Sequence, residues 1–215
     1  MIHNPPNPNP NLPNRHTAAI GLTGSGKSQV IKQIVLPPSG VRCVLFDPSR
    51  DHSKGTHYYS SRSAFARALA AADASGKGFR VAYDGVRSPE VYEWWCECCI
   101  AILDGRKLTY MMTEELAAVS KGPGKALPAH QWLMNESRKY GGVYLCTTQF
   151  PAQISKAVYD NAGCVYLGRQ PPRLQRQFSD QFGIPLEDLK AVENLEFMRW
   201  EAGKVDRVKL QYKKS

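Results

Sequence analysis

The sequence lacks the features of several protein classes. It has no apolar run of the roughly 18 residues that a membrane-spanning helix needs, and no apolar segment near its start that resembles a secretory signal. It has no internal repeat, which argues against a solenoid or a propeller. It also has no second Cys/His pair at zinc spacing to complement Cys96-Glu-Cys98-Cys99, so a zinc site is not expected.

Cysteine usage is typical of a protein from a reducing cytosol. Cys43, Cys146 and Cys164 lie in apolar runs of strand type, where a thiol behaves as a small hydrophobic group. The net charge is +9, which fits a polyanionic partner without proving one.

The first 14 residues are rich in proline and asparagine, which disfavour both helix and sheet. We expect residues 1–14 to form a disordered or extended arm and residues 15–215 to form a single domain. The arm has two open interpretations, a partner-binding segment and a passive tail, and the second is the simpler one.

One stretch, Gly21-Leu-Thr-Gly-Ser-Gly-Lys-Ser28, matches the phosphate-binding loop pattern at every fixed position. Its glycines let successive backbone N–H groups turn toward phosphate oxygens. Lys27 supplies a cation for the β- and γ-phosphates of ATP, and Ser28 supplies a hydroxyl for Mg²⁺. The expected nucleotide-binding residues are Gly21, Thr23, Gly24, Ser25, Gly26, Lys27 and Ser28.

Strand and helix patterns alternate along the chain, which predicts an α/β fold with a mostly parallel sheet flanked by helices. Strands are expected at 17–22, 41–46, 79–83, 108–112, 142–148 and 164–168, and a C-terminal β-hairpin at 196–201 and 205–212. Helices are expected at 28–34, 63–74, 89–103, 128–140, 152–161, 172–182 and 186–193. Because ligands bind at the carboxyl ends of parallel strands, Lys27, Asp47, Glu115 and Gln149 should meet at one edge of the sheet.

An acidic pair follows the apolar strand that ends in Met111-Met112. Hydrolysis needs one acid that supports the metal and one that polarises water. Glu114 is expected to support the metal, and Glu115 to polarise the water. The first acid is usually Asp; Glu is one methylene longer, which favours a water-mediated contact with Mg²⁺. The alternative is a solvated acidic turn.

Two further polar residues flank the strand at 142–148. Gln149 can donate to the γ-phosphate and so sense hydrolysis. Arg138 can stabilise the charge that develops in the transition state if it reaches a neighbouring subunit's nucleotide. Capping of a helix C-terminus explains Arg138 nearly as well.

Together these motifs resemble the FtsK–HerA superfamily of DNA-pumping ATPases. The resemblance covers about residues 15–170 and is most specific in Ser137-Arg-Lys-Tyr-Gly followed by a strand ending in Thr-Gln-Phe-Pro151. It implies a RecA-like core that works as a ring, expected to be a hexamer, with Arg138 acting in trans and Gln149 as sensor. The short chain is also similar to the genome-packaging ATPases of tailless, internal-membrane viruses and to related ATPases of filamentous phages.

Contacts with DNA are expected in the loop that follows the acids. Lys121-Gly-Pro-Gly-Lys125 has flexible glycines and two cations that can contact phosphates without reading sequence. An ordinary surface loop is an equally good interpretation.

The function expected from the sequence is ATP-driven translocation of double-stranded DNA, in the form of a viral genome-packaging motor. Capsid-vertex or membrane proteins are possible further partners, and the expected location is the host cytoplasm or a packaging vertex of the virion. The alternatives are a filamentous-phage-type assembly or export ATPase and a P-loop small-molecule kinase.

Overall fold

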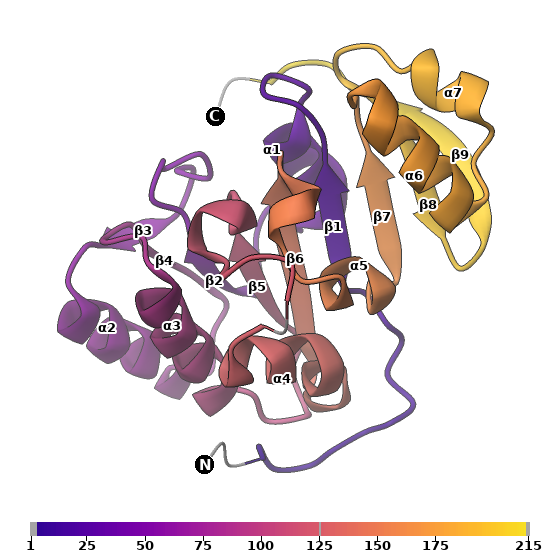
Figure 1. Cartoon of the computed structure of the whole chain (residues 1–215). Helices are drawn as coiled ribbons and strands as arrows, with labels where there is room; N and C mark the ends of the chain where they lie inside the picture. The colour runs from indigo at the N-terminus through magenta and orange to yellow at the C-terminus, as the bar shows by residue number, and fades with distance from the viewer. Residues whose placement is uncertain (1–3, 125, 214–215) are drawn as a thin grey trace.

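A nine-stranded sheet forms the centre of the protein (Figure 1). The structure is a computed structural model that describes residues 4–124 and 126–213. The strands lie in the order β3-β4-β2-β5-β6-β1-β7-β8-β9. Their bounds are β1 (Thr17–Ile20), β2 (Arg42–Phe46), β3 (His57–Tyr59), β4 (Phe79–Tyr83), β5 (Thr109–Thr113), β6 (Gly142–Thr148), β7 (Cys164–Leu167), β8 (Glu196–Glu201) and β9 (Lys204–Lys209).

Among the described residues, every neighbouring pair from β3 to β7 in the sheet order is parallel, and only the β7-β8 and β8-β9 pairs are antiparallel. The predicted α/β fold, with a mostly parallel sheet and a C-terminal hairpin, is therefore confirmed. Parallel pairing places the carboxyl ends of β1, β2, β5 and β6 along one edge of the sheet.

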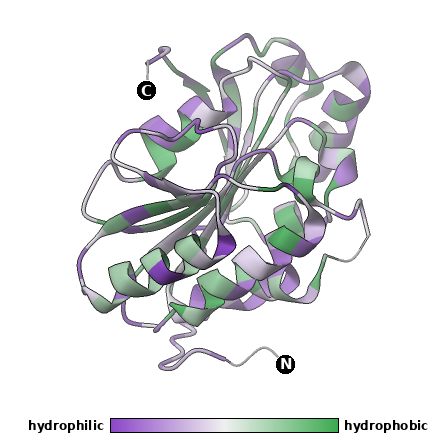
Figure 2. Cartoon of the chain, turned by 90° about the vertical axis from the view of Figure 1, so that its left-hand side faces the viewer, coloured by the Kyte–Doolittle hydropathy of each residue, from purple (hydrophilic) through white to green (hydrophobic). Residues whose placement is uncertain are grey.

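Helices cover both faces of the sheet. They are α1 (Lys27–Val30), α2 (Arg62–Ala74), α3 (Pro89–Ala101), α4 (Pro128–Glu136), α5 (Ala157–Asp160), α6 (Pro172–Phe182) and α7 (Leu186–Lys190), with a π-helix at Ile31–Val35 and 3₁₀ turns at Leu116–Val119, Ser137–Tyr140 and Pro151–Gln153. The segment from α1 to the π-helix packs into one hydrophobic cluster, and α2, α3, α4 and α6 pack into a larger one on the other face. Figure 2 shows hydrophobic and hydrophilic residues interleaved on the surface helices, as expected of elements buried on one side.

Several local expectations differ from the structure, and three of the differences are informative. The helix expected at 28–34 becomes α1 followed by the π-helix, in which the Leu36 amide bonds the Ile31 carbonyl five residues earlier at 2.8 Å. The helix expected at 152–161 is broken at Ile154, which has an extended backbone. Strand β3 was not predicted, because three half-exposed residues at a sheet edge carry no clear apolar alternation.

The larger cluster is built around an aromatic group. The Trp95 side chain is completely buried, stacks on Tyr92 with ring centroids 5.6 Å apart and meets the edge of Phe46 at 5.9 Å. Cys96 and Cys99 lie in the same cluster, and burial raises the pKa of both thiols. This part of the Cys96–Cys99 stretch is therefore core.

The N-terminal segment runs along the edge of the sheet opposite the carboxyl ends of the parallel strands (Figure 1). The amide of Asn9 donates to the Lys139 carbonyl at 2.7 Å, the Asn7 side chain donates to the Asp104 carbonyl at 3.0 Å, and the Asn14 side chain donates to the Asn161 carbonyl at 2.9 Å. Residues 4–14 thus form an irregular segment that contacts the body of the protein. The division into an arm and a domain at residue 14 stays a prediction.

No helix within the described residues is long and apolar enough to cross a membrane.

Truncation of the central aromatic residue should destabilise the fold strongly. We expect Trp95→Ala to lower the free energy of unfolding by about 3–5 kcal/mol, because it leaves a cavity in a close-packed core. Urea denaturation would measure the loss. Val86→Ala, at a side chain that is 66% exposed, is the control and should change stability by less than about 0.5 kcal/mol. Equal losses in the two variants would contradict this account of the core.

Candidate functional site

The phosphate loop connects β1 to α1 and needs its glycines for steric reasons. Gly24 and Gly26 have φ values of 75° and 97°, in the left-handed region that side chains disfavour. A Cβ on Gly26 would also lie 2.7 Å from the Leu195 side chain. The loop is fixed to its neighbours by hydrogen bonds from the Gly21 amide to the Thr148 carbonyl and from the Leu195 amide to the Ser25 carbonyl. Contacts within the chain therefore hold the loop in a defined shape.

Lys27 lies across the loop that it belongs to. Its Nζ donates to the carbonyls of Gly21 at 3.0 Å and Leu22 at 3.2 Å. Burial lowers the pKa of Lys27, and the nearby charges of Glu115 and Glu114 act in the opposite direction. A phosphate oxygen is a stronger acceptor than these carbonyls, so the cation is placed to exchange them for a bound phosphate.

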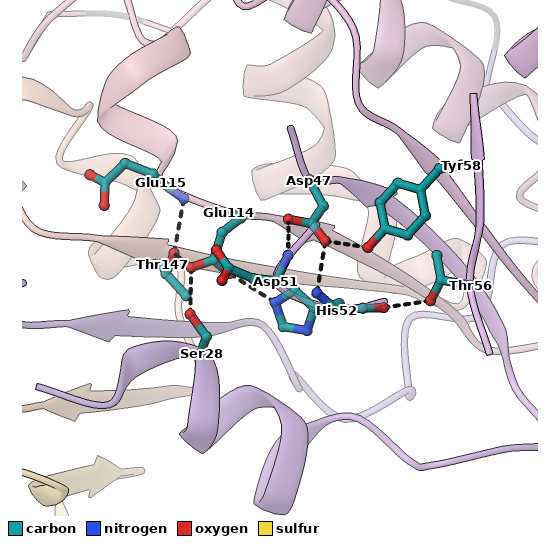
Figure 3. A network of polar contacts seen from close by, with 9 residues as sticks. All are labelled: Ser28, Asp47, Asp51, His52, Thr56, Tyr58, Glu114, Glu115 and Thr147. Atoms are coloured by element: carbon teal, nitrogen blue, oxygen red, sulfur yellow. Dashed lines mark hydrogen bonds and ion pairs between the residues drawn. The ribbon is translucent and has the colours of Figure 1, made fainter. Parts of the chain in front are cut away.

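Glu114 follows β5 and meets the first helical turn after the loop (Figure 3). Its Oε1 accepts from the Ser28 hydroxyl at 2.7 Å and from the Thr147 hydroxyl at 2.9 Å. Burial acts to raise the pKa of this carboxyl, but hydrogen bonds from His52, Ser28 and Thr147 hold it below its usual value. Glu114 is therefore an ionised carboxylate next to the Ser28 hydroxyl.

His52 is a residue of this site that the sequence did not reveal. Its side chain is fully buried, and its Nε2 lies 2.8 Å from Oε2 of Glu114. Because an ionised carboxylate only accepts, Nε2 carries the proton of this bond. The two residues are 62 positions apart, and His52 lies in a polar stretch without periodicity. No local signal could have linked them.

Asp47 holds His52 in place. Its Oδ2 accepts from the His52 amide at 2.9 Å and from the Tyr58 hydroxyl at 2.6 Å, and its Oδ1 accepts from the Asp51 amide at 3.0 Å (Figure 3). Asp47, predicted to lie at this edge because it follows a strand, is completely buried. Its position at the end of β2 was predictable, whereas its role in shaping the 47–58 loop was not.

Glu115 points away from Glu114 (Figure 3). Its backbone is left-handed, with φ 52° and ψ 66°, which is strained for a residue with a side chain. Its amide donates to the Thr147 hydroxyl at 2.9 Å, and its Oε1 accepts from the Gln149 amide at 3.1 Å. Burial raises the pKa of Glu115, and Glu114 adds to the rise, while the Gln149 amide and Lys27 lower it. The two neighbouring acids therefore differ in surroundings and in proton affinity.

Gln149 lies beside the phosphate loop, because the hydroxyl of Thr23 donates to its side-chain carbonyl. The structure thus brings Thr23, Lys27, Ser28, Glu114, Glu115 and Gln149 to the predicted edge of the sheet.

Arg138 does not join this group within one chain. It lies in the 3₁₀ turn that precedes β6, at the opposite edge of the sheet. Its Nη1 donates to the Pro10 carbonyl at 2.7 Å and also to the Leu12 carbonyl. The guanidinium is therefore held by the N-terminal segment.

Of the two lysines predicted to contact DNA, only Lys121 can be described. Its Nζ lies 3.7 Å from the Glu90 carboxylate, and both side chains are exposed. Lys125 lies outside the described residues.

Comparison with known proteins supports the fold. No protein-family model matches the chain. Protein P9 of Pseudoalteromonas phage PM2 is 29% identical over 188 residues, which span 86% of this chain and 83% of that protein. The genome packaging NTPase B204 of Sulfolobus turreted icosahedral virus 2, solved in complex with AMPPCP, has a TM-score of 0.75 and 19% identity, with 93% of this chain and 99% of that chain covered.

VirB4 of Thermoanaerobacter pseudethanolicus has a TM-score of 0.66 and 13% identity, with 93% of this chain and 90% of that chain covered. At these identities the structural similarities establish the fold alone. They confirm the predicted RecA-like P-loop NTPase fold.

The contact between His52 and Glu114 should be measurable as a coupling energy. We expect His52→Ala to lower the free energy of unfolding by about 1–3 kcal/mol, because the buried carboxylate loses a donor. In a double-mutant cycle with Glu114→Ala, the two losses should fall short of additivity by about 0.5–3 kcal/mol. The exposed His57→Ala is the control and should be additive with Glu114→Ala. If the losses from His52→Ala and Glu114→Ala are additive, the contact between the two side chains contributes nothing to stability.

Proposed function

We propose that the chain is an ATP-driven translocase of double-stranded DNA that works as a ring and packages a viral genome. The observation that carries the proposal is the meeting of Lys27, Ser28, Glu114 and Glu115 around the phosphate loop. Nucleotide binding needs the loop, whereas hydrolysis also needs an acid for the metal and an acid for water. Glu114 and Glu115 both lie near the phosphate loop in different surroundings, which supports giving them these two roles.

The phosphate loop and two oxygen ligands fit ATP with Mg²⁺. Ser28 Oγ and Glu114 Oε1 are 2.7 Å apart, and hydroxyl and carboxylate oxygens suit this cation. Ser28 and Glu114 would hold Mg²⁺, which supplies charge neutralisation of the β- and γ-phosphates. Lys27 and the loop amides bind the same phosphates. Complexes of the structurally similar B204 with AMPPCP and with ATP-gammaS support ATP as the ligand.

Glu115 is the proposed general base. In its ionised form it accepts the proton of the attacking water. The Gln149 amide orients one of its oxygens, and the raised pKa makes it a better proton acceptor than an exposed glutamate. Gln149 itself contacts Thr23 of the phosphate loop, which suits a side chain that senses the γ-phosphate.

Arg138 is proposed to act in trans. It and the phosphate loop lie at opposite edges of one sheet, so a head-to-tail contact between two copies would bring them together. Repetition of a head-to-tail contact closes a ring when the rotation allows, and a hexamer is the expected size. The guanidinium would then leave its carbonyl partners in the N-terminal segment.

DNA is proposed to contact Lys121 and Lys125 in the loop after the catalytic acids, through phosphates. The net charge of +9 is in keeping with this partner. Capsid-vertex or membrane proteins remain proposed partners, and the host cytoplasm or the virion is the proposed location. The name of the B204 neighbour, a genome packaging NTPase, supports the packaging role.

The two alternatives have less support. A small-molecule kinase would need a mobile lid rich in arginine. The segment α6 carries Arg173 and Arg176 and could be offered as one. However, α6 buries Phe178 and Phe182 against the core. A filamentous-phage-type assembly or export ATPase would use the same nucleotide site with a different cargo. The DNA experiment below separates it from a translocase.

Double-stranded DNA should stimulate ATP hydrolysis. We expect turnover to rise several-fold on addition of duplex DNA, because a translocase couples the two events. Higher salt should reduce the stimulation, since the contacts are made to phosphates. Steady-state phosphate release over a salt series would measure both effects. If duplex DNA leaves ATP turnover unchanged at every salt concentration, the assembly or export alternative is favoured.

Mixed rings should show whether Arg138 acts across an interface. Glu115→Gln should retain ATP binding and lose about 10²–10⁴-fold in turnover, because the amide accepts no proton. Arg138→Ala should also be nearly inactive, since such an arginine contributes about 10³–10⁵-fold. A mixture of the two should regain activity, because some interfaces then pair an intact Arg138 with an intact Glu115.

Lys139→Ala, which removes the neighbouring cation, is the matched control. It should retain activity on its own, because the Lys139 side chain pairs with Glu136 at 2.6 Å. A mixture of Arg138→Ala and Glu115→Gln that stays inactive would show that Arg138 has a structural role only.

A further inference from the structure

A cavity of about 500 Å³ lies next to α1, the helix that follows the phosphate loop. Its walls come from the segment from α1 to Pro38, from the loop after β2, from β4 and from the C-terminal segment. We propose that this cavity is a second ligand site, which binds a phosphate-bearing molecule of mononucleotide size. Cavities of about 300–1,000 Å³ are typical of small-molecule sites, and a DNA duplex is too wide to enter one.

The charge of the walls points to an anionic ligand. Lys32, Lys54, Arg80 and Lys213 line the cavity, and within residues 4–124 and 126–213 none of them has an ion-pair partner. Asp51 lies close enough to interact with Lys32, but burial and the charges of Glu114 and Asp47 raise the pKa of Asp51. Several unpaired cations around one concave space attract phosphate.

The guanidinium of Arg80 and the backbone of Lys213 are held by hydrogen bonds. Arg80 donates from Nε to the Thr56 hydroxyl and from Nη1 to the Pro37 carbonyl, both at 3.4 Å. These partners are neutral, so they leave the guanidinium charge uncompensated. The Lys213 carbonyl accepts a hydrogen bond from the Gln29 side-chain amide at 2.9 Å. The Lys213 backbone amide donates to the Gln29 side-chain carbonyl at 3.3 Å. The C-terminal segment is thereby held against the wall formed by α1.

The remaining wall is apolar. Ile34 is 45% exposed although it is a large aliphatic residue, and it lines the cavity together with Leu36, Pro37 and Pro38. An inorganic phosphate ion would leave the apolar wall of the cavity without a contact. A nucleotide has a charged end and a flat, weakly polar base, which matches one cationic wall and one apolar wall.

This cavity is separate from the phosphate loop. Lys27, Ser28, Glu115 and Gln149 do not line it. One residue belongs to both places: His52 lines the cavity and contacts Glu114 through Nε2. A ligand in the cavity would therefore touch the residue that orients the acid proposed to hold the metal.

Calorimetric titration of a Lys27→Ala variant with AMP tests the second site. This variant removes the cation of the phosphate loop and leaves the cavity walls intact. We expect it to retain an AMP site whose affinity depends on the cations of the cavity. Adding Lys54→Glu should weaken AMP binding by roughly tenfold or more, because an attraction becomes a repulsion. Lys204→Glu, an equal charge reversal on the exposed β9, is the control and should leave AMP binding unchanged.

One further probe, a 5′-phosphorylated oligothymidine, identifies the source of the phosphate. Tighter binding of AMP than of a 5′-phosphorylated oligothymidine supports a free nucleotide, and the reverse supports the end of a nucleic-acid strand. Loss of all binding in Lys27→Ala, or equal effects of Lys54→Glu and Lys204→Glu, would overturn the proposal. Because the wild-type ATP turnover is measured separately, neither outcome bears on the proposed motor function.

Discussion

The buried carboxylate of Glu114 connects more of the functional edge than any other group described above. A charge removed from water is stable only when hydrogen bonds replace its hydration. For Glu114 they come from Ser28 after the phosphate loop, Thr147 in β6 and His52 after β2. One side chain thus fixes three segments relative to β5. The positions of these segments at the functional edge therefore depend on the hydrogen bonds to Glu114 as much as on the pairing of the strands.

The sequence was informative where the physical cause is local. The phosphate loop is a contiguous pattern, and the apolar strands with their terminal polar residues predict both the parallel sheet and the edge where Glu114, Glu115 and Gln149 meet. His52 was not predictable, because its partner is 62 residues away and one histidine in a polar loop carries no signal. The same holds for the contacts of residues 4–14, where proline and asparagine content indicates only what the backbone cannot form.

The structure divides the proposed chemistry between two ends of one sheet. The carboxyl ends of the parallel strands carry the acids and the phosphate loop, and the opposite edge carries Arg138 with the N-terminal segment. In the proposed ring, the sheet would therefore act as a spacer of fixed length between two half-sites. Its parallel strands suit this role, since every strand from β3 to β7 points from one half-site toward the other.

The central place of β1 has a mechanical consequence. The N-terminal segment leads directly into this strand, which is bonded to β6 on one side and β7 on the other. Tension applied through residues 4–14 loads both ladders in shear, so several hydrogen bonds must break at once. Tension applied through the C-terminus acts first on the few bonds of residues 210–213, such as those between Lys213 and Gln29, and then on β9. Among the described residues β9 is an edge strand paired with β8 alone, so its bonds can break one after another. The protein should therefore resist a pull on its first residues far better than a pull on its last.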